Sequence, residues 1–116
     1  MLYLSDLRQY YLCSSPTDMR KGFDSLCGLV SSRLQLNVLS GAVFIFINRK
    51  GNQLKLLLWE GDGFALYYKR LEKGTFELPA SDGNSAVTVS ARQLQFILQG
   101  VSLDKIQYRK RYKRAG

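Results

Sequence analysis

Histidine is absent from the 116-residue sequence, and there are only two cysteines, Cys13 and Cys27. Without histidine the commonest general acid–base group is missing, and two cysteines outside any CxxC pair do not complete a zinc site. No GxSxG, P-loop or dinucleotide-binding motif occurs either. The sequence therefore predicts a protein that is not an enzyme, with no metal and no cofactor, whose cysteines are buried, reduced thiols.

Long hydrophobic runs are missing as well. The longest apolar stretches have about six residues, against the roughly 20 needed to span a bilayer. The first twelve residues contain no basic region followed by a long apolar run, as a signal peptide would. Since 46% of the residues are hydrophobic, one core can still form. We expect a soluble cytoplasmic protein with no membrane partner.

Acidic residues are lacking at the C-terminal end. Residues 105–116 include six Lys and Arg and no Asp or Glu, which leaves 11 basic and 9 acidic residues in the first 104. We therefore expect a single, nearly neutral domain over 1–104 and a basic tail over 105–116. A basic tail indicates a polyanionic partner, most commonly nucleic acid. The alternative is a solvated tail that only maintains solubility.

Two helices are predicted from the spacing of apolar residues. The first spans about 21–34, where three- and four-residue spacing places five apolar residues on one face: Phe23, Leu26, Cys27, Val30 and Leu34. The second follows Ser90, a typical N-cap, and ends before Gly100. In this helix Leu94, Ile97 and Leu98 share a face.

β-rich runs bounded by turn-forming residues predict strands over 10–13, 42–47, 53–60, 64–70, 75–78 and 86–89. The links between the runs from 42 to 78 have the length of hairpin turns. We therefore expect an α+β domain, in which an antiparallel β-meander of about four to five strands carries two helices at one face or edge.

Long ordered blocks of the chain resemble one family. PTDMRKGFDSL (16–26) and NRKGNQLKLLLWEGDGFALYYKRLEKGTFELP (48–79) are similar to the TnpB accessory proteins, which the second open reading frame of bacterial insertion sequences of family sixty-six encodes. The resemblance covers about residues 1–104 and includes ARQLQFILQGVSL near its end. It implies an accessory role in DNA transposition, with the separate transposase and other proteins of the element as partners. It implies no molecular mechanism.

The first candidate binding surface comprises two basic turns. Arg49 and Lys50 lie at the tip of the hairpin over 48–52. Two turns later in the chain, near 72–74, are Lys69, Arg70 and Lys73. Alternate turns of a meander project from the same end of the sheet, so we expect one basic edge that contacts phosphates, with Tyr67 or Tyr68 stacking on an unpaired base. The alternative is that hairpin tips are charged because they are solvated, and that one or both of the tyrosines belong to the core.

Two further basic groups are candidates. Arg20 and Lys21 lie at the start of the first predicted helix, where backbone amides and cations together favour a phosphate. Alternatively, Asp18 caps this helix or pairs with Arg20. The tail has Tyr108 and Tyr112 among five basic residues that are expected to contact DNA or an acidic patch of the transposase: Arg109, Lys110, Arg111, Lys113 and Arg114.

A metal-dependent nuclease is the strongest enzyme hypothesis, because transposition cuts DNA. Asp18 followed by Gln53 and Lys55 loosely resembles a restriction-type pattern, but Gln53 stands where a second carboxylate is normally found. Glu60 and Asp62 flank a glycine and predict a tight turn rather than a cation site. We therefore favour a DNA-binding accessory protein over a module that docks on the transposase without DNA contact. The oligomeric state is left open.

Overall fold

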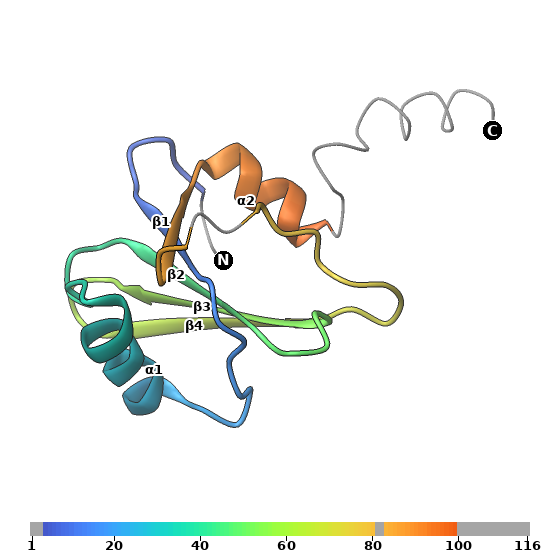
Figure 1. The fold of residues 1–116 in the computed structure, drawn as a ribbon. Coiled ribbons are helices and arrows are strands. Elements are labelled where there is room, and N and C mark those ends of the chain that lie inside the picture. Colours follow the sequence, from blue (N-terminus) through green and yellow to red (C-terminus); the bar gives the residue numbers. More distant parts are fainter. Residues whose placement is uncertain (1–3, 81–82, 100–116) are drawn as a thin grey trace.

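The computed structural model describes residues 4–80 and 83–99. Figure 1 shows their elements, which confirm the α+β class. The predicted tail lies outside the described residues. In chain order the elements are β1 (Tyr10–Cys13), α1 (Phe23–Leu29), the π-helical segment η1 (Val30–Leu34), β2 (Val43–Ile47), β3 (Gln53–Trp59), β4 (Phe64–Arg70), β5 (Ala86–Val89) and α2 (Ala91–Leu98).

The five strands form one mixed sheet in the order β4-β3-β2-β1-β5. The prediction of a purely antiparallel meander is wrong at its centre, because β1 pairs with β2 in parallel, with Tyr10 opposite Val43. The physical reason is the crossover through α1, which returns the chain to the end of the sheet where β1 began. The hairpins β2–β3 and β3–β4 are antiparallel, as predicted.

The segment 75–78 is not a strand, in contrast to the prediction. Instead the chain crosses the end of the sheet after β4. The backbone N–H of Leu71 donates to the carbonyl of Asn52 at 2.8 Å, and that of Phe76 donates to the carbonyl of Gly51 at 2.8 Å. Phe76 is buried against the core, so this segment covers the sheet rather than extending it.

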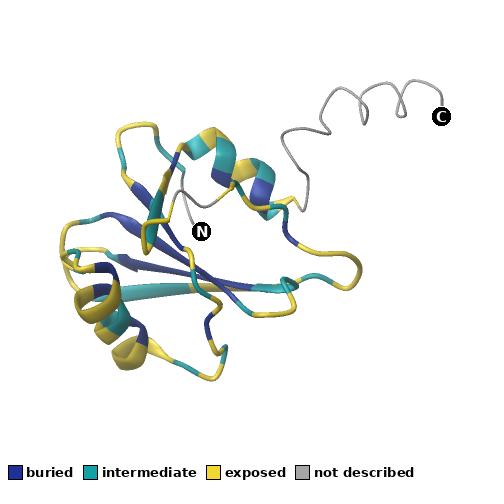
Figure 2. Cartoon of the chain, in the orientation of Figure 1, coloured by how far each residue is buried: buried dark blue, intermediate teal, exposed yellow. Residues whose placement is uncertain are grey.

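The helices cover opposite faces of the sheet, so the expectation of helices at one face or edge is wrong (Figure 1). Leu26 and Val30 pack with Phe44 on one face, whereas Leu94 packs with Ile45 on the other. All five residues of β2 are buried, because both of their faces are covered. Figure 2 shows this dark central layer between the two helical layers.

Each helix has its own terminal arrangement. Ser90 caps α2 in a capping box: its Oγ accepts from the backbone N–H of Gln93 at 3.0 Å, and Oε1 of Gln93 accepts from the N–H of Ser90 at 2.7 Å. At α1 the N-cap is Gly22, with no side-chain cap, so the interpretation in which Asp18 caps this helix is wrong. Phe23 is 46% exposed, unlike the other apolar residues of the predicted face.

Both cysteines are free in the structure. Cys13 is buried, as predicted, whereas Cys27 is only half-buried. Burial, together with the negative charge of Asp24, raises the pKa of the Cys27 thiol, so the unreactive protonated form predominates at neutral pH. Among the described residues, no helix is long and apolar enough to cross a membrane.

Candidate nucleic-acid interface

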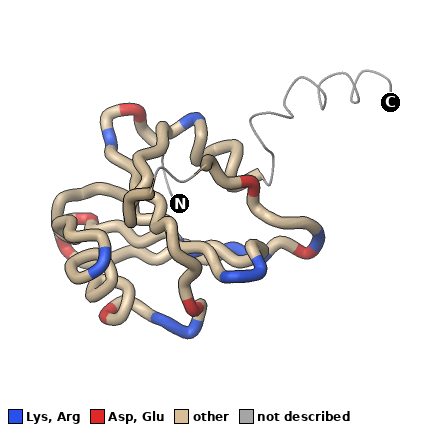
Figure 3. The backbone as a smooth tube through the Cα atoms, viewed as in Figure 1, with Lys and Arg blue, Asp and Glu red and all other residues tan. Residues whose placement is uncertain are grey.

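Three strands deliver basic segments to one edge of the sheet. β1, β2 and β4 run in the same direction, so the segments that follow them emerge at the same end. The N–H of Thr17, after β1, donates to the carbonyl of Ile47 at the end of β2 at 2.8 Å. Figure 3 shows Lys and Arg in the loop before α1, in the β2–β3 hairpin and around the end of β4.

A hollow of about 650 Å³ opens at this edge. It brings together Arg20, which follows β1, with Arg49 and Lys50 of the β2–β3 hairpin. The sequence predicted these residues as two separate sites. The structure joins them through the parallel pairing of β1 with β2. We call this site the basic hollow, and its lining consists of Pro16, Thr17, Asp18, Met19, Arg20, Asn48, Arg49, Lys50, Gln53 and Tyr68.

The hairpin that carries Arg49 and Lys50 is fixed from within by Asn48. Oδ1 of Asn48 accepts from the N–H of Asn52 at 3.0 Å and from that of Gln53 at 2.9 Å. Gly51 has a φ of 75°, which glycine adopts without strain. Arg49 and Lys50 are exposed at the tip, and Asn48 supplies the side-chain hydrogen bonds described for this turn, so the two basic side chains are accessible to a ligand.

Arg20 is the partner of Asp18 at the rim of the hollow. Nε and Nη2 of Arg20 donate to the carboxylate, and the Arg20 backbone N–H donates to Oδ1 at 2.9 Å. These hydrogen bonds, the side-chain one foremost, lower the pKa of Asp18 to about 2. The interpretation in which Asp18 pairs with Arg20 is therefore confirmed, and at neutral pH one of the three cations is partly neutralised.

Lys55 supports the site without lining the hollow, and the sequence, which placed Lys55 only in a nuclease-like pattern, did not indicate this role. Its side chain is 8% exposed, and its Nζ donates to the carbonyls of Met19 and Lys21, both at 2.8 Å. It thereby fastens the loop that carries Arg20 to the sheet. A charged residue within a strand is normally exposed, so only the tertiary position of the 19–21 carbonyls reveals this role.

Tyr68 covers Lys55 from the edge strand. The two residues are directly opposite in the β3–β4 register, and Nζ of Lys55 lies 5.0 Å from the ring centroid. The hydroxyl of Tyr68 donates to Oε1 of Gln53. Tyr68 and Tyr67 are both exposed, so the alternative in which these tyrosines belong to the core is wrong.

The remaining basic candidates are more dispersed. Lys69 is on the face opposite Tyr68, where its Nζ donates to the carbonyl of Leu98 in α2 at 2.6 Å. Arg70 forms an exposed 3.7 Å ion pair with Glu72, and Lys73 is exposed in the loop that follows. Lys21 precedes α1 and does not line the hollow. The five candidates of the tail lie outside the described residues.

The residues of the restriction-type pattern come close together, but their chemistry differs from that of a nuclease. Asp18 and Gln53 both line the basic hollow, and Lys55 is bonded to the adjacent loop. Asp18 is the one acidic residue of the lining, and its carboxylate is held by Arg20. Two-metal cleavage needs several oxygen ligands that converge on the ions, so this arrangement favours anion binding over metal-dependent hydrolysis.

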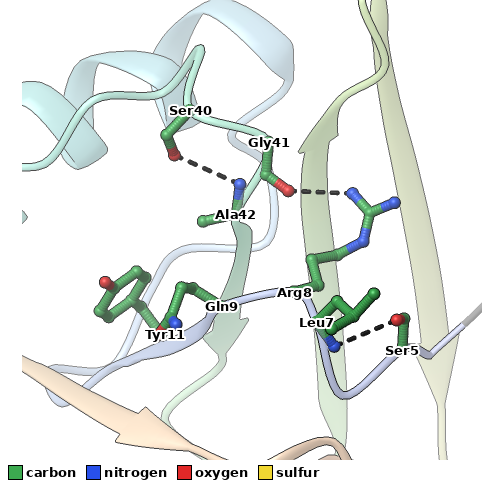
Figure 4. Close-up of a pocket in the computed structure, with 8 residues that line it drawn as sticks. All are labelled: Ser5, Leu7, Arg8, Gln9, Tyr11, Ser40, Gly41 and Ala42. Atoms are coloured by element: carbon green, nitrogen blue, oxygen red, sulfur yellow. Dashed lines mark hydrogen bonds between the residues drawn. The ribbon is translucent and has the colours of Figure 1, made fainter.

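A second hollow, of about 350 Å³, lies at the opposite end of the sheet, where β1 and β2 begin. Figure 4 shows that Arg8 is directed at the carbonyl of Gly41, to which its Nη1 donates at 2.9 Å. Of the residues that line this hollow, Arg8 alone is charged. With one cation in its lining against three in the basic hollow, this hollow attracts phosphates less strongly.

Comparison with known proteins identifies the family. Residues 8–108 match the family described as "IS66 Orf2 like protein". The chain belongs to this family. Membership of the IS66 Orf2-like family implies that the protein is an accessory protein associated with transposition. The matched residues include the loop before α1 and both hairpins.

Two curated relatives of this IS66 Orf2-like chain come from Sinorhizobium fredii (strain NBRC 101917 / NGR234). "Uncharacterized protein y4hO" is 40% identical over 91 residues, which is 78% of each chain. "Uncharacterized protein y4jC" is 31% identical over 104 residues, covering 89% of this chain and 86% of the relative. No solved structure matches the chain.

Proposed function

We propose that the protein is a non-catalytic accessory factor of transposition that binds DNA through the basic hollow. The observation that carries this proposal is the convergence of Arg20, Arg49 and Lys50 around one concave site. Lys and Arg gathered in a concave surface concentrate the positive potential and attract the DNA backbone. The basic tail, 105–116, is proposed to add sequence-independent phosphate contacts to the same complex.

The proposed role is non-catalytic because the hollow offers one carboxylate, which Arg20 already pairs with. The surrounding groups are instead suited to hold a phosphate. Arg presents planar donors to two oxygens of one phosphate, and Lys contributes a mobile point charge. We accordingly assign strand transfer to the transposase and DNA binding in the cytoplasm to this protein.

Reversal of both hairpin charges tests the proposal. In the Arg49→Glu, Lys50→Glu variant, we expect DNA affinity at about 0.1 M salt to fall by at least about tenfold, and the slope of log K against log salt to decrease by about two. The turn itself is held by Asn48 and Gly51, so the thermal melting curve is expected to change little. Fluorescence anisotropy with a labelled duplex over a salt series measures the affinities.

The matched control is the Arg33→Glu, Arg92→Glu variant, which has the same net charge as the Arg49→Glu, Lys50→Glu variant. Both residues are exposed, and neither lines the hollow. The control is expected to bind more tightly than the hairpin variant at every salt concentration. Equal affinities would show that only total charge matters and would remove the site assignment. If the unmodified protein does not bind DNA even at low salt, the result contradicts the proposal and supports the alternative in which the protein docks on the transposase without DNA contact.

Neutralising Asp18 is expected to strengthen binding. The Asp18→Asn variant loses the negative charge that pairs with Arg20, so we expect about threefold higher DNA affinity at about 0.1 M salt. This gain is smaller than the contribution of one full phosphate contact. Asp62→Asn, in the turn between β3 and β4, makes the same charge change outside the hollow and serves as the control. An equal gain in both variants would contradict a local effect.

A further inference from the structure

Tyr68 is held rigidly on one face and open on the other. Its inner face lies over Nζ of Lys55 at 5.0 Å, and Lys55 is itself buried beneath it. The hydroxyl is bonded to Gln53, which limits rotation of the ring. Nevertheless 54% of Tyr68 is exposed, and because the inner face is covered, this exposure belongs to the outer face and ring edge.

An ordered aromatic ring beside cations matches the chemistry of single-stranded nucleic acid binding. Such sites combine a positively charged groove for the backbone with aromatic rings on which unpaired bases stack. Tyr68 lines the same hollow as Arg49 and Lys50. Because the ring is already fixed, a base that stacks on it does not have to pay for ordering the side chain.

Duplex DNA does not make the same use of this ring. Within a duplex both faces of each base are stacked on neighbouring bases, and only the base edges are accessible in the grooves. A strand with unpaired bases exposes the faces that an aromatic ring recognises. The hollow therefore offers duplex DNA its charges alone, and single-stranded DNA its charges together with a stacking surface.

We propose that the basic hollow binds single-stranded DNA, with one unpaired base stacked on the outer face of Tyr68 and the adjoining phosphates contacted by Arg49 and Lys50. This proposal rests on the proposed function and specifies the form of DNA that the site prefers. The family is associated with DNA transposition, which is consistent with DNA as the ligand of this site.

The test compares Tyr68→Leu with Tyr67→Leu. Tyr67 is the neighbouring exposed tyrosine on the same strand, but it faces the other side of the sheet and does not line the hollow. The probes are a labelled oligothymidylate of about 12 nucleotides and a duplex of the same length. Tyr68→Leu is expected to lower affinity for the oligothymidylate by about tenfold and to leave duplex affinity within about twofold. Tyr67→Leu is expected to bind both probes like the unmodified protein. Tyr68→Phe keeps the ring but loses the hydroxyl bond to Gln53, so it is expected to retain most of the affinity for the oligothymidylate and to bind it more tightly than Tyr68→Leu does.

Photocrosslinking gives a readout that does not depend on a substitution. An oligothymidylate with one 5-iodouracil, irradiated with the unmodified protein, is expected to attach to Tyr68, as located by tandem mass spectrometry. A crosslink at Tyr67 or at the tail alone would overturn the proposal. If Tyr68→Leu has a lowered melting temperature, the crosslink and the Tyr68→Phe variant decide whether a base stacks on Tyr68.

The outcomes separate this inference from the function on which it rests. If Arg49→Glu, Lys50→Glu weakens binding while Tyr68→Leu leaves oligothymidylate binding intact, the stacking site is wrong and DNA binding by the hollow stands. Equal losses on both probes in Tyr68→Leu would also overturn the stacking site. If the unmodified protein binds neither probe at low salt, both proposals fail together.

Discussion

Replacing Phe44 by alanine is expected to lower the free energy of unfolding by about 3–5 kcal/mol, the range for truncating a buried phenylalanine. Phe44 is 0% exposed at the centre of the sheet, and its ring stacks on Tyr11 with centroids 5.9 Å apart. Domains of this size are stable by only about 5–15 kcal/mol. The melting temperature is expected to fall by at least about 12 °C, measured by circular dichroism.

Phe23→Ala is the matched control, because it truncates the same side chain at the start of α1. Periodicity alone placed Phe23 on the buried face of the helix, but it is 46% exposed. We expect a loss below about 1 kcal/mol there, since truncations at the surface have small effects. Comparable losses in the two variants would mean that α1 is rotated relative to the sheet and that the described core is wrong.

Replacing Lys55 by methionine is expected to destabilise the protein by about 2–3 kcal/mol. The substitution preserves most of the side-chain volume, but the carbonyls of Met19 and Lys21 lose their donor. Hydrogen bonds to a charged group are each worth about 1.5–3 kcal/mol, and relief from burying the ammonium offsets part of this loss. Urea denaturation gives the free energy, and DNA affinity is expected to fall because Arg20 is no longer held beside the hairpin.

Hydrogen exchange locates the effect of Lys55→Met. The backbone amides of the segment 17–21 are expected to exchange faster in this variant. They include the amide of Thr17, which donates to the carbonyl of Ile47. Lys69→Met is the control, because Lys69 donates to one carbonyl on the other face of the sheet. It is expected to leave exchange in 17–21 unchanged. Faster exchange there in both variants would indicate general destabilisation rather than release of the loop.

Local patterns predicted most elements of the fold. Ser90, as a typical N-cap, predicted the start of α2, and the β-rich runs on either side of 48–52 predicted the first hairpin. The parallel pairing of Tyr10 with Val43 was missed, because it depends on where a crossover helix returns the chain, which periodicity within each segment does not encode. The segment 75–78 has strand-like residues, but hydrogen bonds to the neighbouring hairpin determine its path.

The candidate site was predicted in pieces. Charge and turn propensity identified Arg20, Arg49 and Lys50, but only the topology unites them. Lys69 was grouped with Arg70 by adjacency, although neighbouring residues of a strand point to opposite faces. Lys55 was missed because its role depends on carbonyls 34 and 36 residues away in the chain.

The two walls of the hollow come from segments far apart in the chain, so the assembled hollow is a late product of folding. Met19 and Lys55, which join the two walls, are 36 residues apart, and such long-range pairings are slow to form. Before they form, the chain carries the same charges as separate basic peptides without a common geometry. A truncated or misfolded copy keeps its positive charges but cannot present the assembled surface, so the proposed selective binding of DNA requires a fully formed sheet.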